Sequence, residues 1–143
     1  MVELDAGHNE LVALSDSLLG DQTQLERVSF AHNQLQLVSS RLLPERNKIE
    51  ELDLAANFIT DFPEDLINRL EKLQKLYINQ NAVRRLGRSA FRGLGELEVV
   101  DLHDNRIDFI EDDAFKDLRS LKSLDLSLGG NSIEYKSFWE FFR

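Results

Sequence analysis

The sequence predicts an α/β solenoid, a curved horseshoe segment with a parallel β-sheet on its concave side and an irregular or short-helical convex side. Three observations predict this fold. Segments of eleven residues recur at a spacing of 24 residues, each begins with alternating apolar and polar side chains, and each carries an asparagine at its ninth position. They give five full repeats and a partial sixth, with starting residues 1, 25, 49, 73, 97 and 121.

The alternation in each segment predicts a short strand. In residues 49–59, which read IEELDLAANFI, the side chains of Leu52 and Leu54 lie on one side and that of Asp53 on the other. The 24-residue return brings the next strand alongside in parallel, and the apolar residues between strands cover the core from behind. One such unit cannot bury its apolar side, whereas a stack of at least three can do so.

The asparagine at position nine is expected to turn the chain off the strand. Its side chain can pair with backbone groups that would each cost about 1–3 kcal/mol if buried without partners. The last asparagine is late, because Gly129 occupies its expected place, and we predict a two-residue bulge at Gly129 and Gly130. A splice or annotation error is the alternative. The structural asparagine ladder comprises Asn9, Asn33, Asn57, Asn81, Asn105 and Asn131.

The segments IEELDLAANFI and LEVVDLHDNRI match the pattern L-x-x-L-x-L-x-x-N-x-L, so the chain resembles the leucine-rich repeat family. Ala90–Phe91 and Ala114–Phe115, at positions eighteen and nineteen, resemble the typical class found in chaoptin, Slit and Toll-like receptor ectodomains. The resemblance implies a protein-binding module in an adhesion or receptor-like protein. We place the solenoid at residues 1–133 and an aromatic tail at 134–143, either an improvised cap or sequence outside the repeat.

The composition narrows the classes of partner. The chain has 143 residues, no cysteine and a net charge of −9, so disulfides and thiolate metal sites are excluded. The negative charge argues against nucleic acid or an anionic membrane as a partner, since phosphate binding needs a cationic surface. Apolar stretches of three or four residues predict no membrane insertion by this segment. We expect no cofactor, no metal and no enzymatic activity.

Positions three, five, seven and eight of each repeat are expected to face outward on the concave sheet. Tyr77 is the predicted anchor of a protein interface, because tyrosine and tryptophan dominate interface energetics. Aspartates recur at position five, and they indicate either a partner with a basic surface or only a solvated sheet. The candidate binding residues are Glu3, Asp5, His8, Arg27, His32, Glu51, Asp53, Lys75, Tyr77, Asn79, Gln80, Asp101, His103, Asp104 and Asp125.

The concave face offers two further candidate sites. His8 and His32 share position eight in adjacent repeats, so their rings could approach and bind a metal, although zinc needs three or four ligands. Asp101, His103 and Asp125 could act as a hydrolase, because neighbouring carboxylates can separate their pKa values. An open sheet does not exclude water, so the binding interpretation is preferred over the catalytic one.

The two ends of the solenoid bear on its cellular context. The chain begins at position one of a repeat without a polar capping unit, so we expect a fragment of a longer cell-surface protein, which would lie outside the cell. The alternative is a complete intracellular scaffold in signalling, which would be cytoplasmic, since residues 1–11 lack the features of a signal peptide. Uncapped ends would also permit self-association.

Overall fold

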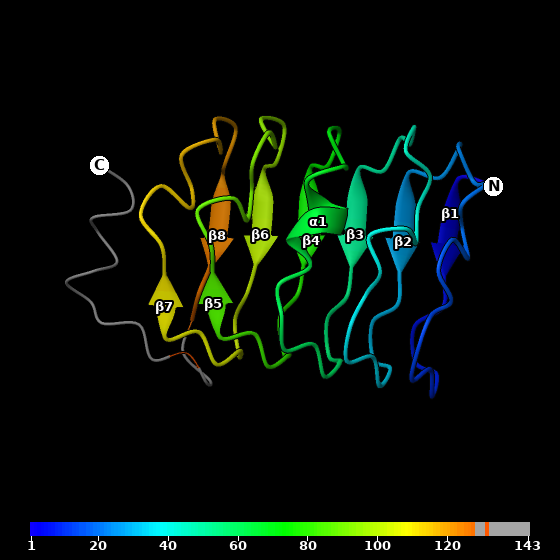
Figure 1. Cartoon of the computed structure of the whole chain (residues 1–143), viewed down its shortest axis with the longest axis horizontal. Coiled ribbons are helices and arrows are strands. Elements are labelled where there is room, and N and C mark those ends of the chain that lie inside the picture. The colour runs from blue at the N-terminus through cyan, green and yellow to red at the C-terminus, as the bar shows by residue number, and fades with distance from the viewer. Residues whose placement is uncertain (128–130, 132–143) are drawn as a thin grey trace.

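The computed structural model describes residues 1–127 and residue 131. Its main element is a six-stranded parallel sheet whose strands lie side by side across the long axis of the molecule (Figure 1). The sheet order is β1-β2-β3-β4-β6-β8. The strands are β1 (Glu3–Asp5), β2 (Arg27–Ser29), β3 (Glu51–Asp53), β4 (Lys75–Tyr77), β6 (Val99–Asp101) and β8 (Ser123–Asp125).

The strand register confirms the repeat. Leu52 pairs with Val28 on one side and with Leu76 on the other, each 24 residues away, and the remaining strand pairs keep the same step. Leu52 and Leu54 are fully buried, while Asp53 between them is only half-buried. The alternation in the sequence therefore sets which side of the sheet faces the core.

The looser second repeat fills its part of the core with different residues. Where repeats four and five have the alanine–phenylalanine pair, repeat two has Leu42 and Leu43, and both are buried. Leu19 does the same in repeat one, whereas Leu18 beside it is exposed. Apolar volume is thus preserved although the residue types change.

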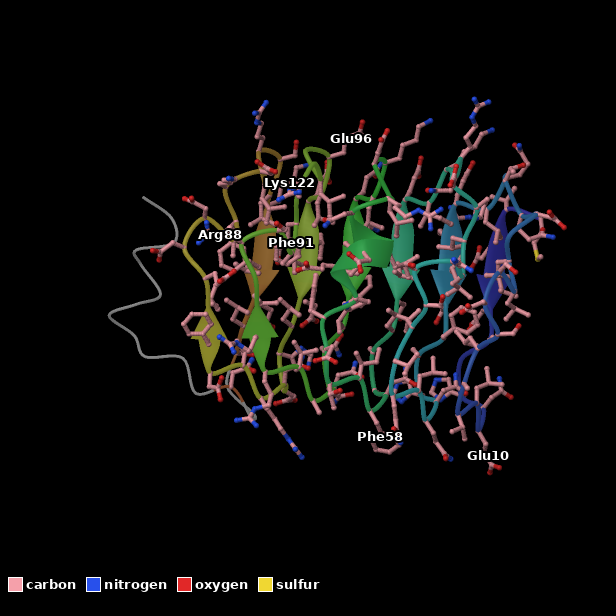
Figure 2. The ribbon with its side chains drawn as sticks, in the orientation of Figure 1. Glu10, Phe58, Arg88, Phe91, Glu96 and Lys122 are labelled. Carbon is pink, nitrogen blue, oxygen red and sulfur yellow. The ribbon has the colours of Figure 1, made fainter. Side chains whose placement is uncertain are left out.

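The convex side is mostly irregular, with one short helix, α1 (Glu64–Ile67), among the described residues. A second, two-stranded parallel sheet pairs β5 (Arg85–Leu86) with β7 (Phe109–Ile110), which the sequence did not predict. Two-residue strands are too short to show an alternating pattern, so this sheet has no recognisable signal. Phe91, labelled in Figure 2, is fully buried. Its ring packs between those of Phe62 and Phe115, with centroids 5.2 and 5.7 Å away.

The asparagine side chains link successive repeats. Asn57 Oδ1 accepts the Leu35 N–H at 3.0 Å, and Asn57 Nδ2 donates to the Phe30 carbonyl of the preceding repeat at 3.0 Å and to the Leu54 carbonyl of its own repeat at 3.1 Å. Asn33, Asn81 and Asn105 repeat this arrangement. Asn9 bonds only within its own repeat among the described residues.

Asn131 occupies the ladder in spite of its late position. Its Oδ1 accepts the Ile107 N–H at 2.9 Å, and its Nδ2 donates to the Leu102 and Leu126 carbonyls. The partners of Asn131 are those expected for position nine, but each lies two residues further away in the sequence than in the other repeats. The predicted bulge at Gly129 and Gly130 and the aromatic tail at 134–143 lie outside the described residues.

The residue before each of the first five asparagines has a left-handed backbone. His8, His32, Ala56, Gln80 and Asp104 have φ values between 53° and 56°. This conformation is uncommon in residues other than glycine. It could not be predicted from the sequence, because the five residues share no side-chain property. No helix in the described ranges has the length and apolar character needed to cross a membrane.

Candidate functional site

The concave face is the side of the main sheet that carries positions three and five. At position three, the cations of the face are paired with acids of the preceding repeat. Arg27 lies 3.3 Å from Glu3, and Lys75 lies 3.9 Å from Glu51. The positive charges of these strands are therefore partly neutralised within the sheet.

Position five follows a different rule, because its side chain bonds its own backbone. Oδ1 of Asp53 accepts the N–H of Ala55, two residues later, at 2.9 Å. Equivalent bonds of 2.8–3.1 Å are made by Asp5, Asp101 and Asp125, and Ser29 uses its hydroxyl in the same way. Such side-chain turns are typical of aspartate and serine, so the aspartate column has a structural reason to exist.

A hollow of about 410 Å³, which we call the acidic hollow, lies on the concave face. Its small residues come from position seven, where Gly7, Ala31 and Ala55 stand in the first three repeats. A Cβ at Gly7 would lie 3.0 Å from Asp5 Oδ1 and 3.1 Å from the Ala31 carbonyl, so a side chain there would crowd its neighbours. The lining residues are Asp5, Gly7, His8, Ser29, Ala31, His32, Asp53, Ala55, Tyr77, Asn79 and Asp101.

The hollow is electrostatically negative. Within residues 1–127 and 131, neither Asp5 nor Asp53 forms an ion pair. Burial is the main cause that raises the pKa of Asp53, partly opposed by its hydrogen bond with Ala55. Burial also raises the pKa of Tyr77, with a further contribution from the neighbouring carboxylates of Glu51 and Asp53. A cation entering the hollow would relieve this accumulated negative charge.

His103 lies among three carboxylates beside the hollow. Its Nδ1 is 2.6 Å from Asp101 and 3.9 Å from Asp125, and its Nε2 is 3.6 Å from Asp104. The hydrogen bond with Asp101 is the largest cause that raises the pKa of His103, so the charged imidazole is favoured. Hydrogen bonding from Ser127 lowers the pKa of Asp125.

The structure brings together the three residues of the hydrolase hypothesis, and one ligand atom from each lies within 4.8 Å of the others. Asp101, His103 and Asp125 are all half-buried, and Asp125 keeps 47% of its side-chain surface exposed. General acid–base chemistry that relies on a desolvated carboxylate pair gains little in such an open position. The geometry supports a cluster of hydrogen-bonded charged groups better than a catalytic centre.

His8 and His32 approach each other as the shared position suggested. Their rings stack with centroids 4.2 Å apart and planes inclined by 10°. The lone pair of each imidazole nitrogen lies in its own ring plane, so nearly parallel stacked rings do not direct two nitrogens at one metal ion. This geometry does not fit a metal site shared by His8 and His32.

A second hollow, of about 440 Å³, lies among Thr60, Asp61, Phe62, Arg84, Arg85, Asp108 and Phe109. Arg84 pairs with Asp108 of the next repeat at 3.1 Å. The guanidinium of Arg85 stacks over the ring of Phe109, 4.6 Å from its centroid. These arginines are therefore engaged by neighbouring side chains.

The candidate residues divide between the acidic hollow and its surroundings. Lining the hollow are Asp5, His8, His32, Asp53, Tyr77, Asn79 and Asp101. Outside its lining are Glu3, Arg27, Glu51, Lys75, Gln80, His103, Asp104 and Asp125. Gly7, Ser29, Ala31 and Ala55 also line the hollow and were not predicted as binding residues. The signal for Gly7, Ala31 and Ala55 was the run of small residues at position seven, whereas Ser29 stands at position five in the aspartate column.

Comparison with known proteins supports the repeat assignment. A family model described as leucine rich repeat matches residues 47–103 and 95–140. Among curated proteins, none matches the chain. Three similar solved structures cover nearly all of the chain.

The Drosophila Toll–Spatzle complex aligns with a TM-score of 0.87 and 27% identity over 94% of this chain. The TLR13–ssRNA13 complex aligns with a TM-score of 0.76 and 27% identity over 93%. A leucine-rich repeat protein of Leptospira interrogans shares the fold, with a TM-score of 0.84 and 24% identity over 97%. The chain spans only 18%, 17% and 34% of the TLR13, Toll and Leptospira chains. Because one relative is in complex with single-stranded RNA, the comparisons do not support the exclusion of nucleic acid as a ligand class.

Proposed function

The chain belongs to the leucine-rich repeat family, and we propose that it is a binding module that holds a protein partner on its concave face. The observation that carries this proposal is the acidic hollow, which combines the side chain of Tyr77 with Asp5 and Asp53, two carboxylates that have no ion pair among the described residues. Solenoids bind their partners on extended concave surfaces, and tyrosine is among the residues that contribute most to protein interfaces.

We further propose that the module belongs to a receptor-like or adhesion protein at the cell surface. The similarity to Toll in its complex with Spatzle supports this context, since both chains share the solenoid at 27% identity. A net charge of −9 and a carboxylate-lined hollow favour a protein with a basic surface over RNA as the partner.

The test is a binding screen of the immobilised chain against a panel of secreted proteins and cell-surface ectodomains. We expect a partner whose affinity falls about tenfold or more with Tyr77→Ala, because aromatic residues at the centre of an interface carry much of its energy. Phe58→Ala is the matched control, since Phe58 is an exposed aromatic residue outside the acidic hollow (Figure 2).

Two results would count against the proposal. A partner that is sensitive to Phe58→Ala and insensitive to Tyr77→Ala would bind another surface. Binding of RNA in place of any protein, lost in the Tyr77 variant, would assign a different class of ligand. Circular dichroism of both variants must match the parent chain, so that the loss of binding is not a loss of fold.

A further inference from the structure

We propose that the acidic hollow binds a basic segment in the polyproline II conformation, with lysine or arginine at every third residue. This inference rests on the proposed function and adds the chemistry and the spacing of the partner. Successive cations of the segment would contact Asp5, Asp53 and Asp101, and the segment would run across the strands, along the long axis of the sheet. Three features of the concave face support it.

The first feature is the distribution of charge. The face carries cations at position three, but Arg27 and Lys75 are paired with Glu3 and Glu51. In the part of the chain that the structure describes, no such cation pairs with Asp5 or Asp53 at position five. Asp101, at the same position, is paired through Oδ1 with His103 at 2.6 Å. The negative charge without an ion-pair partner is therefore carried by Asp5 and Asp53, and a basic segment would complement it.

The second feature is the spacing of these carboxylates. The register places Ser29 between Asp5 and Asp53, and Tyr77 between Asp53 and Asp101. From β1 to β6, carboxylates thus occupy alternate strands, and two strand separations amount to about 9.6 Å. On β8, Asp125 directly follows Asp101, so the alternation ends there. A polyproline II helix has three residues per turn and a rise of 3.1 Å, so every third side chain points the same way at intervals of about 9.3 Å.

Other backbone conformations fit this spacing less well. In a β-strand, side chains on one face recur at about 6.8 Å, which is shorter than the spacing of the carboxylates. Residues three apart in a strand point to opposite faces. In an α-helix, residues seven apart are separated by about 10.5 Å and rotate progressively off the common face. The polyproline II segment is therefore the conformation whose period matches the carboxylates of the concave face.

The third feature is that the side chains of the hollow are preorganised for binding such a segment. In Asp5, Asp53 and Asp101, one carboxylate oxygen accepts a hydrogen bond from the backbone N–H two residues later. This bond fixes the side chain before binding and lowers the entropic cost of binding. The ring of Tyr77, between Asp53 and Asp101, offers an aromatic contact of the kind that receives proline-rich segments in other domains. The small residues at position seven leave depth for the cationic side chains.

The test uses two synthetic peptides of identical composition and the full chain. One carries the arginine-proline-proline triplet four times, and the other has its four arginines contiguous. Fluorescence anisotropy at about 0.15 M salt, where long-range attraction is screened, measures both affinities. We expect the periodic peptide to bind about tenfold more tightly, because only its cations reach all three carboxylates together.

A matched pair of variants separates the hollow from net charge. Asp53→Asn keeps the acceptor for the Ala55 N–H and should lower the affinity for the periodic peptide about tenfold. Glu96→Gln removes the same charge at an exposed acid outside the hollow (Figure 2), and should change the affinity less than about twofold. Equal affinity of the two peptides, or equal losses in the two variants, would overturn the inference.

The outcome is distinguishable from failure of the proposed function. A protein partner that depends on Tyr77 and is displaced by the periodic peptide supports both. A partner that depends on Tyr77 but is displaced by neither peptide leaves the proposed function standing and overturns this inference. Absence of any partner that depends on Tyr77, with tight binding of the periodic peptide, would oppose the proposed function alone.

Discussion

Asp53 both stabilises and destabilises the fold, through its hydrogen bond and through its partly buried charge. Its Oδ1 accepts the Ala55 N–H, while burial raises its pKa above the ordinary value of 3.8. A group whose folded-state pKa is raised contributes stability below its unfolded pKa and loses that contribution as the pH rises through the folded pKa. The ionised carboxylate is therefore a small cost to the folded state at neutral pH.

Asp53→Asn should remove that cost, because the amide keeps the acceptor oxygen and carries no charge. We expect the free energy of unfolding at pH 7 to rise by about 0.3–0.5 kcal/mol, a value reduced for solvent screening at this half-exposed site. Near pH 3 the gain should vanish. Urea unfolding at both pH values measures it, with Asp5→Asn as the control at an exposed site with the same backbone bond. A gain that is the same at pH 3 would contradict the explanation.

Ala56 occupies a backbone conformation that its side chain disfavours, with φ of 53°. Left-handed backbone costs residues other than glycine roughly 1–2 kcal/mol. Ala56→Gly should therefore raise the free energy of unfolding by about 0.5–1 kcal/mol, after the larger entropy of glycine in the unfolded chain is subtracted. Thermal unfolding measures the change.

The neighbouring Ala55 provides the control, because it is not among the described residues with positive φ. Ala55→Gly should lower stability by about 0.5–1 kcal/mol. If both glycine variants were destabilised equally, strain at position eight would be refuted as the reason.

At the scale of the element, the strands and the ladder were predictable and the turns were not. The strand at Leu52 and Leu54 was predictable, because buried positions carry apolar residues and the position between them carries a polar one. His32, Ala56 and Asp104 share a left-handed backbone but no chemistry, since the main chain alone imposes it. The contact between Arg85 and Phe109 was also missed, because counting repeat positions places Arg85 level with Asp61.

The ladder makes each asparagine worth more where a preceding repeat exists. Asn57→Ala would leave the Leu35 N–H and the Phe30 carbonyl without their bonds inside the core, so we expect a loss of about 3 kcal/mol. Asn9→Ala should cost about 1 kcal/mol or less, because Asn9 is exposed and, within the described part of the chain, bonds only two carbonyls of its own repeat. Urea unfolding of the two variants provides the comparison, and equal losses would argue against a role between repeats.

At the scale of the whole molecule, the sequence predicted the architecture but not the site. The period fixed which strands are neighbours, so the adjacency of Asp101 and Asp125 and the approach of His8 to His32 followed from counting. The acidic hollow could not be predicted by counting repeat positions. It depends on the volume of the side chains at position seven and on which carboxylates form ion pairs. Packing and pairing are properties of the folded chain.

The cluster of Phe62, Phe91 and Phe115 tests how far the effect of one core substitution extends along the solenoid. Phe91 is fully buried between Phe62 and Phe115, and Phe91→Ala should cost about 3–5 kcal/mol. Because each repeat of a solenoid contacts only its neighbours, hydrogen exchange should increase around β4 and β6 and stay slow in β1 and β2. Exposed Phe58→Ala should change stability by less than about 0.5 kcal/mol. Uniform loss of protection along the chain would contradict this local response.

The orientation of the main sheet has a mechanical consequence. Its strands lie across the long axis, so the hydrogen bonds between them run along that axis (Figure 1). A pulling force applied between β1 and β8 would break the hydrogen bonds of one strand pair after another. Each strand pair that opens would release one 24-residue repeat, which is about 80 Å of extended chain. Under tension the solenoid would therefore lengthen in regular steps at low force and act as an extensible tether.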